Sequence, residues 1–245
     1  IKLGRRDEVA NVSFFPFEVR AHHPFPAGCC LVVCFSGITA RKTMNAKGVF
    51  NARVACYHMA RELIKARFPE FAERIAHLRV VNTERLDVSL PALYSILKEV
   101  PNAISTAEIE RLAERHPTVA KCVGGLTLSE HVFPLRDVAL FGLAECERAR
   151  AAGALLRAGD EAGIGRMMSL SHDGDRVTRW MPEREAFSAT ADAARMEELI
   201  ARAREARPLS ASGAALWQQP GAYACSLAEI DRMVDCALRV PLIYR

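Results

Sequence analysis

His172 and its acidic neighbours form the one cluster in this sequence whose residue types suit catalysis. A histidine next to Asp173 and close to Asp175 could act as a general base or bind a metal ion. The same residues also suit the end of a helix at Ser171 and His172, with Gly174 supplying the turn. We favour the helix end, because such an end followed by a glycine needs no catalytic role.

The local motifs that would nominate an active site are absent from the sequence. It has no Gly-x-x-x-x-Gly-Lys-Ser/Thr loop, no Gly-x-Gly-x-x-Gly, no His-Glu-x-x-His and no Gly-x-Ser-x-Gly. None of its eight cysteines belongs to a Cys-x-x-Cys pair, so we expect no zinc site and assign no metal-binding residue. The cysteines are expected to be reduced and to pack as small apolar side chains.

Other charged and polar groups are expected to have structural roles. His22 and His23 precede a proline-rich turn and are predicted to be a solvated loop pair. The charged residues of one predicted helix are expected to pair on its exposed surface: Glu145, Glu147, Arg148 and Arg150.

Size and composition indicate a globular protein that buries a core. The chain has 245 residues, of which half are hydrophobic and a quarter are charged, with a formal net charge of +4. Basic and acidic residues are interleaved, so we expect no nucleic-acid partner. We find neither a signal peptide nor an apolar run long enough to cross a bilayer, and we therefore expect a cytoplasmic protein without a membrane partner.

The N-terminal part reads as strands. Residues 9–20 are rich in β-branched and aromatic residues, residues 23–28 read as a turn, and residues 29–35 read as a short strand buried on both faces.

From Asn45 onward apolar residues recur at helical spacing. Further helices are predicted over 69–78, 90–99, 106–115, 136–158, 160–172, 191–206 and 226–238, and an irregular polar stretch over 173–190. Ser105 and Ser226 each begin a capping-box pattern.

One predicted helix has a line of small residues that would let another helix approach closely: Gly142, Cys146, Ala149 and Gly153. Strands followed by helices predict an α+β fold, with helices packed against one face of an antiparallel sheet. Residues 79–134 are the least patterned and are read as a possible insertion.

Four segments, in the same order, resemble the galactokinase branch of the GHMP sugar kinases. The first is a strand ending in Val33-Cys34-Phe35-Ser36, and the second, Gly48-Val49-Phe50-Asn51-Ala52-Arg53, is similar to the family's Tyr-Asn-x-Arg helix entry. The third comprises 144–148, 158–160 and 165–172, similar to a Glu-x-x-Arg helix, a Gly-Asp turn and a Leu-Met-x-x-Ser-His helix end. The fourth is 220–234, similar to Ser-x-x-Glu-Leu-Asp-x-Leu-Val.

The resemblance implies an ATP-dependent kinase that phosphorylates the anomeric hydroxyl of a monosaccharide, with Mg²⁺ as cofactor. It also implies that residues 1–245 are only part of such a kinase, truncated at both ends: the end of the sheet region over about 1–40 and a helical C-terminal region over about 41–245. The ATP loop, the Mg²⁺ ligands and the catalytic aspartate are expected before Ile1. The chain alone is therefore expected to be inactive.

The resemblance assigns sugar binding to Phe50 and Arg53. Phe50 stands where galactokinases have a tyrosine that hydrogen-bonds a sugar hydroxyl, so galactose is in doubt and another sugar, such as a pentose like arabinose or a heptose, is an alternative. Phe50 could equally be a core aromatic at a helix entry. Arg53 could face the sugar or orient the strand–helix junction, and we favour the second role.

Two further alternatives remain open. The first is a GHMP-like protein that binds sugar but only senses it or acts as a scaffold. The second is an unrelated helical binding module, which would be favoured if residues 9–35 were not extended.

Overall fold

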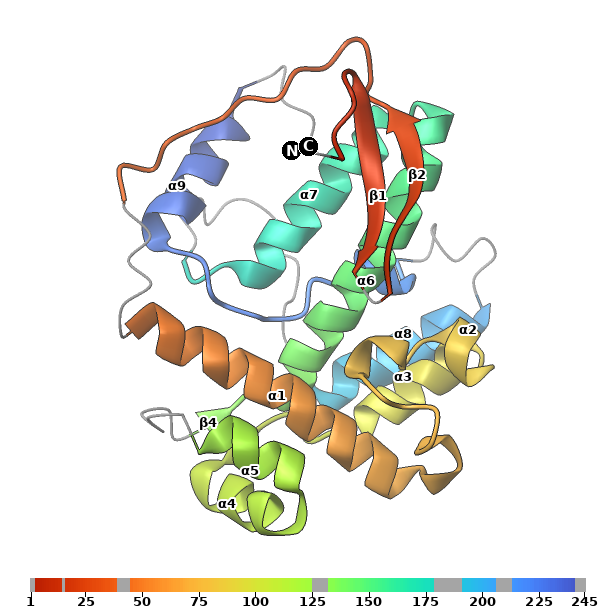
Figure 1. Ribbon diagram of the computed structural model, residues 1–245, viewed down its shortest axis with the longest axis vertical. Helices are drawn as coiled ribbons and strands as arrows, with labels where there is room; N and C mark the ends of the chain where they lie inside the picture. The colour runs from red at the N-terminus through yellow and green to blue at the C-terminus, as the bar shows by residue number, and fades with distance from the viewer. Residues whose placement is uncertain are drawn as a thin grey trace.

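The computed structural model describes residues 3–14, 16–38, 45–124, 132–178, 191–205 and 213–240. Two long helices, α1 (Asn45–Arg67) and α6 (Leu135–Ala158), run through the middle of the molecule, and a hairpin of β1 (Glu8–Phe14) and β2 (Phe17–Pro24) lies beside α6 (Figure 1). The chain is therefore α+β, as the sequence predicts, with a small antiparallel sheet and a helix-rich remainder.

Both strands of the hairpin contact α6: Asn11 of β1 donates to the Ala149 carbonyl oxygen at 3.3 Å, and β2 packs on the helix. β1 and β2 pair antiparallel, with a register shift between Asn11 and Val12. His23 of β2 is only 4% exposed, and a Cβ added at Gly153 of α6 would lie 2.6 Å from its Nε2 atom. Our interpretation of His22 and His23 as a solvated loop pair is therefore wrong, because both lie in β2 and the small residue opposite His23 makes room for its imidazole ring. The small residues of α6 thus allow two close contacts: His23 of β2 packs on Gly153, and Tyr57 of α1 packs on Gly142.

The predicted strand over 29–35 does not form. These residues join no sheet, and Leu31, Val32, Val33 and Phe35 are between 75% and 95% exposed. A strand needs a partner for its backbone groups, and the described hairpin ends before this run begins.

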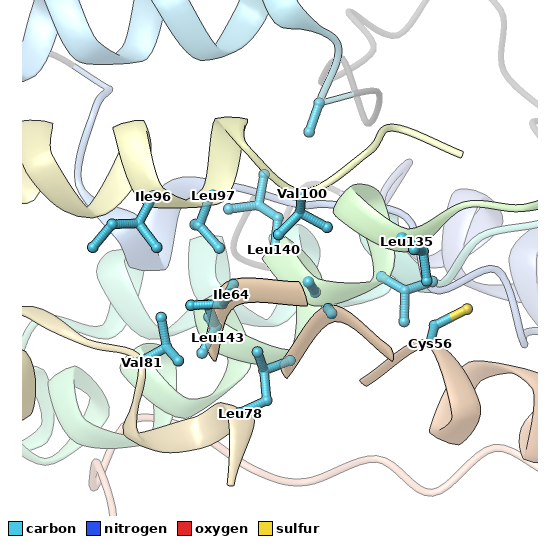
Figure 2. Close-up of a cluster of buried hydrophobic side chains, with 14 of the residues drawn as sticks. Cys56, Ile64, Leu78, Val81, Ile96, Leu97, Val100, Leu135, Leu140 and Leu143 are labelled. Carbon is cyan, nitrogen blue, oxygen red and sulfur yellow. The ribbon is translucent and has the colours of Figure 1, made fainter. Parts of the chain in front are cut away.

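A common apolar core lies where α1 and α6 meet η2 (Leu78–Val80) and α3 (Leu90–Lys98) (Figure 2). The labelled side chains converge from these four elements and the loops that follow them: Cys56, Ile64, Leu78, Val81, Ile96, Leu97, Val100, Leu135, Leu140 and Leu143. Cys56 is fully buried, as the helical spacing predicts, but Cys30, Cys34 and Cys236 are exposed, so the prediction of buried cysteines is wrong for these three.

Short elements complete this core. They are η1 (Pro69–Phe71), α2 (Thr83–Leu86), β3 (Ile104–Ser105), α4 (Thr106–Arg115), α5 (Pro117–Val123) and β4 (Val132–Phe133). The helices predicted over 90–99 and 106–115 are confirmed, the second with its capping box between Ser105 and Glu108. The helix predicted over 69–78 is wrong, since only a 3₁₀ turn follows Pro69.

The C-terminal helices are α7 (Glu161–Asp175), α8 (Ala193–Glu205) and α9 (Ala228–Ala237), with η4 (Leu216–Gln218) between the last two. Gly159 ends α6 at φ 64°, and the side chain of Asp160 accepts the Gly163 N–H at 2.8 Å to begin α7. α7 extends to Asp175, three residues beyond the predicted end. Residues 179–190, within the predicted irregular stretch, lie outside the described residues.

Ser226 does not cap α9. Leu227 is the N-cap residue and makes no side-chain capping bond, while the Ser226 hydroxyl hydrogen-bonds Asp231 instead. Among the described helices, none has the length and apolarity needed to span a membrane.

Candidate functional site

The end of α7 meets α9 and the segment that precedes it. The carbonyl oxygen of Gly174 accepts the backbone N–H of Tyr223 at 2.7 Å, and the Ser226 N–H donates to the carbonyl oxygen of Asp175 at 3.0 Å. Gly174 lies inside the helix rather than in a turn: a Cβ there would overlap the Pro220 carbonyl oxygen. Our interpretation of Gly174 as the turn residue is therefore wrong, and its lack of a side chain serves close approach.

Asp231 is the buried centre of this junction. Its side chain is fully buried, and Oδ2 accepts the backbone N–H groups of Val177 and Thr178 at 3.0 and 2.8 Å. Burial alone would raise the pKa of Asp231, but these bonds, with that from Ser226 and the nearby His172, hold it below its ordinary value. Asp231 thus fixes the backbone that leaves α7.

His172 faces Asp231 without being hydrogen-bonded to it. Nε2 of His172 lies 3.2 Å from Oδ1 of Asp231, yet both atoms are buried and neither makes a hydrogen bond among the described residues. Burial and the nearby Arg176 lower the pKa of His172 and outweigh the attraction of Asp231. The imidazole is therefore neutral at pH 7, as a general base or a ligand-binding group would be.

Arg176 adds a second tie between α7 and α9. It binds Asp235 through two nitrogens at 2.9 and 2.7 Å and Asp173 at 2.9 Å. The acidic neighbours that suggest chemistry in the sequence are thus divided in the structure. Asp173 belongs to an ion-pair network, and Asp175 points into the groove described below.

Arg53 connects α1 to the same junction. Its Nε donates to the carbonyl oxygen of Tyr223 at 2.6 Å, and the residue is only 7% exposed. Tyr223 stacks between Tyr57 and Phe141, with ring centroids 6.0 and 5.0 Å away. The position of Arg53 agrees with the orienting role that we favour from the sequence.

Phe50, the other predicted sugar-binding residue, is 55% exposed one helical turn before Arg53. It is therefore neither buried in the core nor a lining residue of the groove between α6 and α7. The structure brings Arg53 to the junction and leaves the ring of Phe50 on the surface of α1.

A groove of about 520 Å³ lies between α6 and α7. Its apolar part is formed by Phe141, Ala149, Ala152, Ile164, Met167 and Met168. Its polar end is formed by Glu145, Arg148, Ser171, His172 and Asp175.

Arg148 is 4% exposed. Its Nε donates to Glu145 Oε1 at 2.7 Å, and its Nη1 donates to the carbonyl oxygens of Trp217 and Gln219 at 2.7 and 2.9 Å. The expectation of a surface pair is wrong for Arg148, because η4 covers this face of α6. Glu147 and Arg150 form the expected exposed pair at 2.7 Å.

Asp175 has a different environment from Asp231. Its Oδ1 accepts the backbone N–H of Cys225 at 2.8 Å, but burial, reinforced by the charges of Asp231 and Glu145, raises its pKa above the ordinary value. A half-buried carboxylate whose ionised form is disfavoured is a candidate for binding or proton transfer.

The described residues contain no group of three His, Cys, Asp or Glu side chains placed to hold a metal ion. The part of the chain described here thus offers no Mg²⁺ site. The side chains of His172 and Asp175 can instead supply hydrogen bonds and proton transfer.

Sequence reasoning missed Asp231, Arg148 and the separate role of Asp175. Asp231 lies 59 residues from His172, so only the tertiary fold reveals the pair. One signal was available for Asp231: it stands at the Asp of the Ser-x-x-Glu-Leu-Asp pattern in the fourth resembling segment. For Arg148 the available signal was the Glu-x-x-Arg pattern of the third resembling segment, which ends at Arg148.

No protein-family model, curated protein or solved structure matches this chain. The resemblance to galactokinases therefore depends on the four sequence segments alone.

Proposed function

We propose that this chain forms part of an ATP-dependent sugar kinase that phosphorylates the anomeric hydroxyl of a monosaccharide. The support is the order of the four segments, of which the second, third and fourth meet in space, although the strand expected for the first does not form. Arg53 of the second segment bonds Tyr223 of the fourth, and His172 of the third lies 3.2 Å from Asp231 of the fourth. Segments that build one junction are expected to occur together in one family.

The observation that carries the proposal is the exposure of Phe50. An aromatic ring left 55% exposed can pack against the apolar face of a sugar ring. Arg53, one turn further along α1, holds the neighbouring chain segment in place. Phenylalanine supplies no hydroxyl. This chain therefore lacks the hydrogen bond by which a tyrosine at position 50 would favour galactose.

ATP and Mg²⁺ are expected to be bound by other residues of such an enzyme. The described residues provide no acidic cluster for the metal, so we assign to them the sugar side of the reaction and derive no step through Mg²⁺ or ATP.

The test uses the complete protein that contains this chain. It would be incubated with ATP, Mg²⁺ and, separately, galactose, arabinose and a heptose, and ³¹P NMR would detect a sugar 1-phosphate. Phe50→Tyr is expected to raise kcat/KM for galactose relative to the other sugars by up to about tenfold, the value of one hydrogen bond of roughly 0.5–1.5 kcal/mol. Phe17→Tyr is the matched control, because Phe17 is a similarly exposed ring, 62%, on the hairpin.

Absence of phosphorylation with every sugar would refute the kinase. Sugar binding without phosphorylation would favour the sensor or scaffold instead. Turnover with a selectivity that Phe50→Tyr leaves unchanged would refute the role of Phe50.

A further inference from the structure

We infer that the groove between α6 and α7 is a binding site for a small amphipathic organic cation, an amine with an apolar body. This site is separate from the sugar-binding surface proposed for Phe50, which is not among the groove residues.

The size and walls of the groove suit such a ligand. Small-molecule pockets usually have volumes of about 300–1,000 Å³, and this groove, at about 520 Å³, lies within that range. Met167, buried, and Met168, 64% exposed, form part of the floor and the lip. Thioether side chains adapt to ligands of different shape. Ala149 and Ala152 of α6 leave space where larger residues would fill the groove.

The charges at the polar end favour a cation. Nε of Arg148 donates to Oε1 of Glu145 at 2.7 Å. The charges of these two residues neutralise each other, so Arg148 does not compensate the charge of Asp175. Asp175 uses Oδ1 for the Cys225 N–H, and among the described residues its Oδ2 accepts no hydrogen bond. The neighbouring Asp231 adds to the negative potential around Asp175. An ammonium group at Oδ2 of Asp175 would gain a charge-assisted hydrogen bond and relieve this repulsion.

The two parts of the groove together define the ligand class. The apolar floor along Ile164 and Met167 would bury the hydrocarbon body, while Asp175 would bind the charged end. A neutral ligand would leave Asp175 without a counter-charge, and an anion would meet its carboxylate group.

The experiment compares three probes with the same hydrocarbon body and different charge: n-hexylamine, 1-hexanol and hexanoate. The chain would be labelled with ¹³C at its methionine methyl groups and titrated at pH 7 and low salt. Hexylamine is expected to shift the Met167 and Met168 signals with a Kd at least about tenfold lower than that of hexanol, and hexanoate is expected not to bind. Met59 and Met196, buried in the core, serve as internal references that should not shift.

Two variants distinguish binding of hexylamine in the groove from its general attraction to acidic residues on the surface. Asp175→Asn is expected to weaken hexylamine at least fivefold and to leave hexanol unchanged. Glu147→Gln removes a carboxylate from the same helix outside the groove and is expected to change neither ligand. Hexanol binding as tightly as hexylamine, hexanoate binding more tightly, or shifts confined to other methionines would each overturn the inference. The three-probe comparison needs only the unmodified chain, so it decides the matter even if Asp175→Asn fails to fold.

Discussion

Gly174 provides the sharpest test of how α7 and the segment before α9 fit together. Replacing it with alanine places a Cβ 2.6 Å from Cδ2 of Phe141 and still closer to the Pro220 carbonyl oxygen, where ordinary contacts measure 3.4–4 Å. The carbonyl group belongs to the backbone and cannot rotate away, so the helix and the segment must separate. Overpacking of this kind costs up to about 3 kcal/mol, and the higher helix propensity of alanine returns about 1 kcal/mol. We expect Gly174→Ala to lower the free energy of unfolding by about 2 kcal/mol.

Urea unfolding followed by far-UV circular dichroism would measure this loss. Gly48→Ala is the matched control, because a Cβ at that position of α1 meets nothing within 4 Å, and this variant is expected to gain up to about 1 kcal/mol. The variant Gly174→Asn tests whether glycine is needed at position 174 for close packing or for a left-handed turn. Asparagine is tolerated in the left-handed conformation of a helix-ending residue, but in a crowded helix it should be at least as harmful as alanine. A Gly174→Asn variant more stable than Gly174→Ala would refute the packing argument.

Three further predictions concern the junction. Arg53→Lys should destabilise the chain by about 1 kcal/mol or more in urea unfolding, because lysine cannot reproduce the buried bond to the Tyr223 carbonyl. Asp231 contributes stability above its unfolded pKa near 3.8 that is lost as the pH falls through its lower folded pKa, so Asp231→Asn should flatten the fall of Tm below pH 4. Asp175 has a raised pKa and so costs stability at pH 7; Asp175→Asn, which keeps the Oδ1 acceptor, should leave Tm unchanged or raise it, and a clear fall would contradict this account.

Periodicity in the sequence predicts the helices well. α3, α4, α6 and α8 form within about two residues of their expected bounds, and α1 begins at the expected Asn45, because each carries an apolar face, and in α4 a capping box, within its own residues. Asp160 likewise marks the start of α7 by a bond to the nearby Gly163. Interactions that close within a few residues can be recognised from the sequence, since spacing along the chain fixes spacing in the structure.

Interactions between distant segments could not be predicted in the same way. Gly174 suits a turn in the local sequence, and only the arrival of Pro220, 46 residues later, makes it a packing residue. Arg148 has the spacing of a surface ion pair until η4 covers it. The run 29–35 has the composition of a buried strand, but composition alone does not supply the neighbouring strand that would bury it.

Asp175 and Asp231 show why the geometry, rather than the residue type, separates structural from functional carboxylates. Both are acids within the same junction, and burial alone would raise the pKa of each. Asp231 receives two backbone N–H groups and the hydroxyls of Thr178 and Ser226, so its charge is satisfied and it fixes the backbone. Asp175 receives one N–H and lies near two other carboxylates, so its charge is poorly compensated. A ligand that supplied a counter-charge would therefore gain more at Asp175 than at Asp231. Asp175 lines the groove, and Asp231 does not.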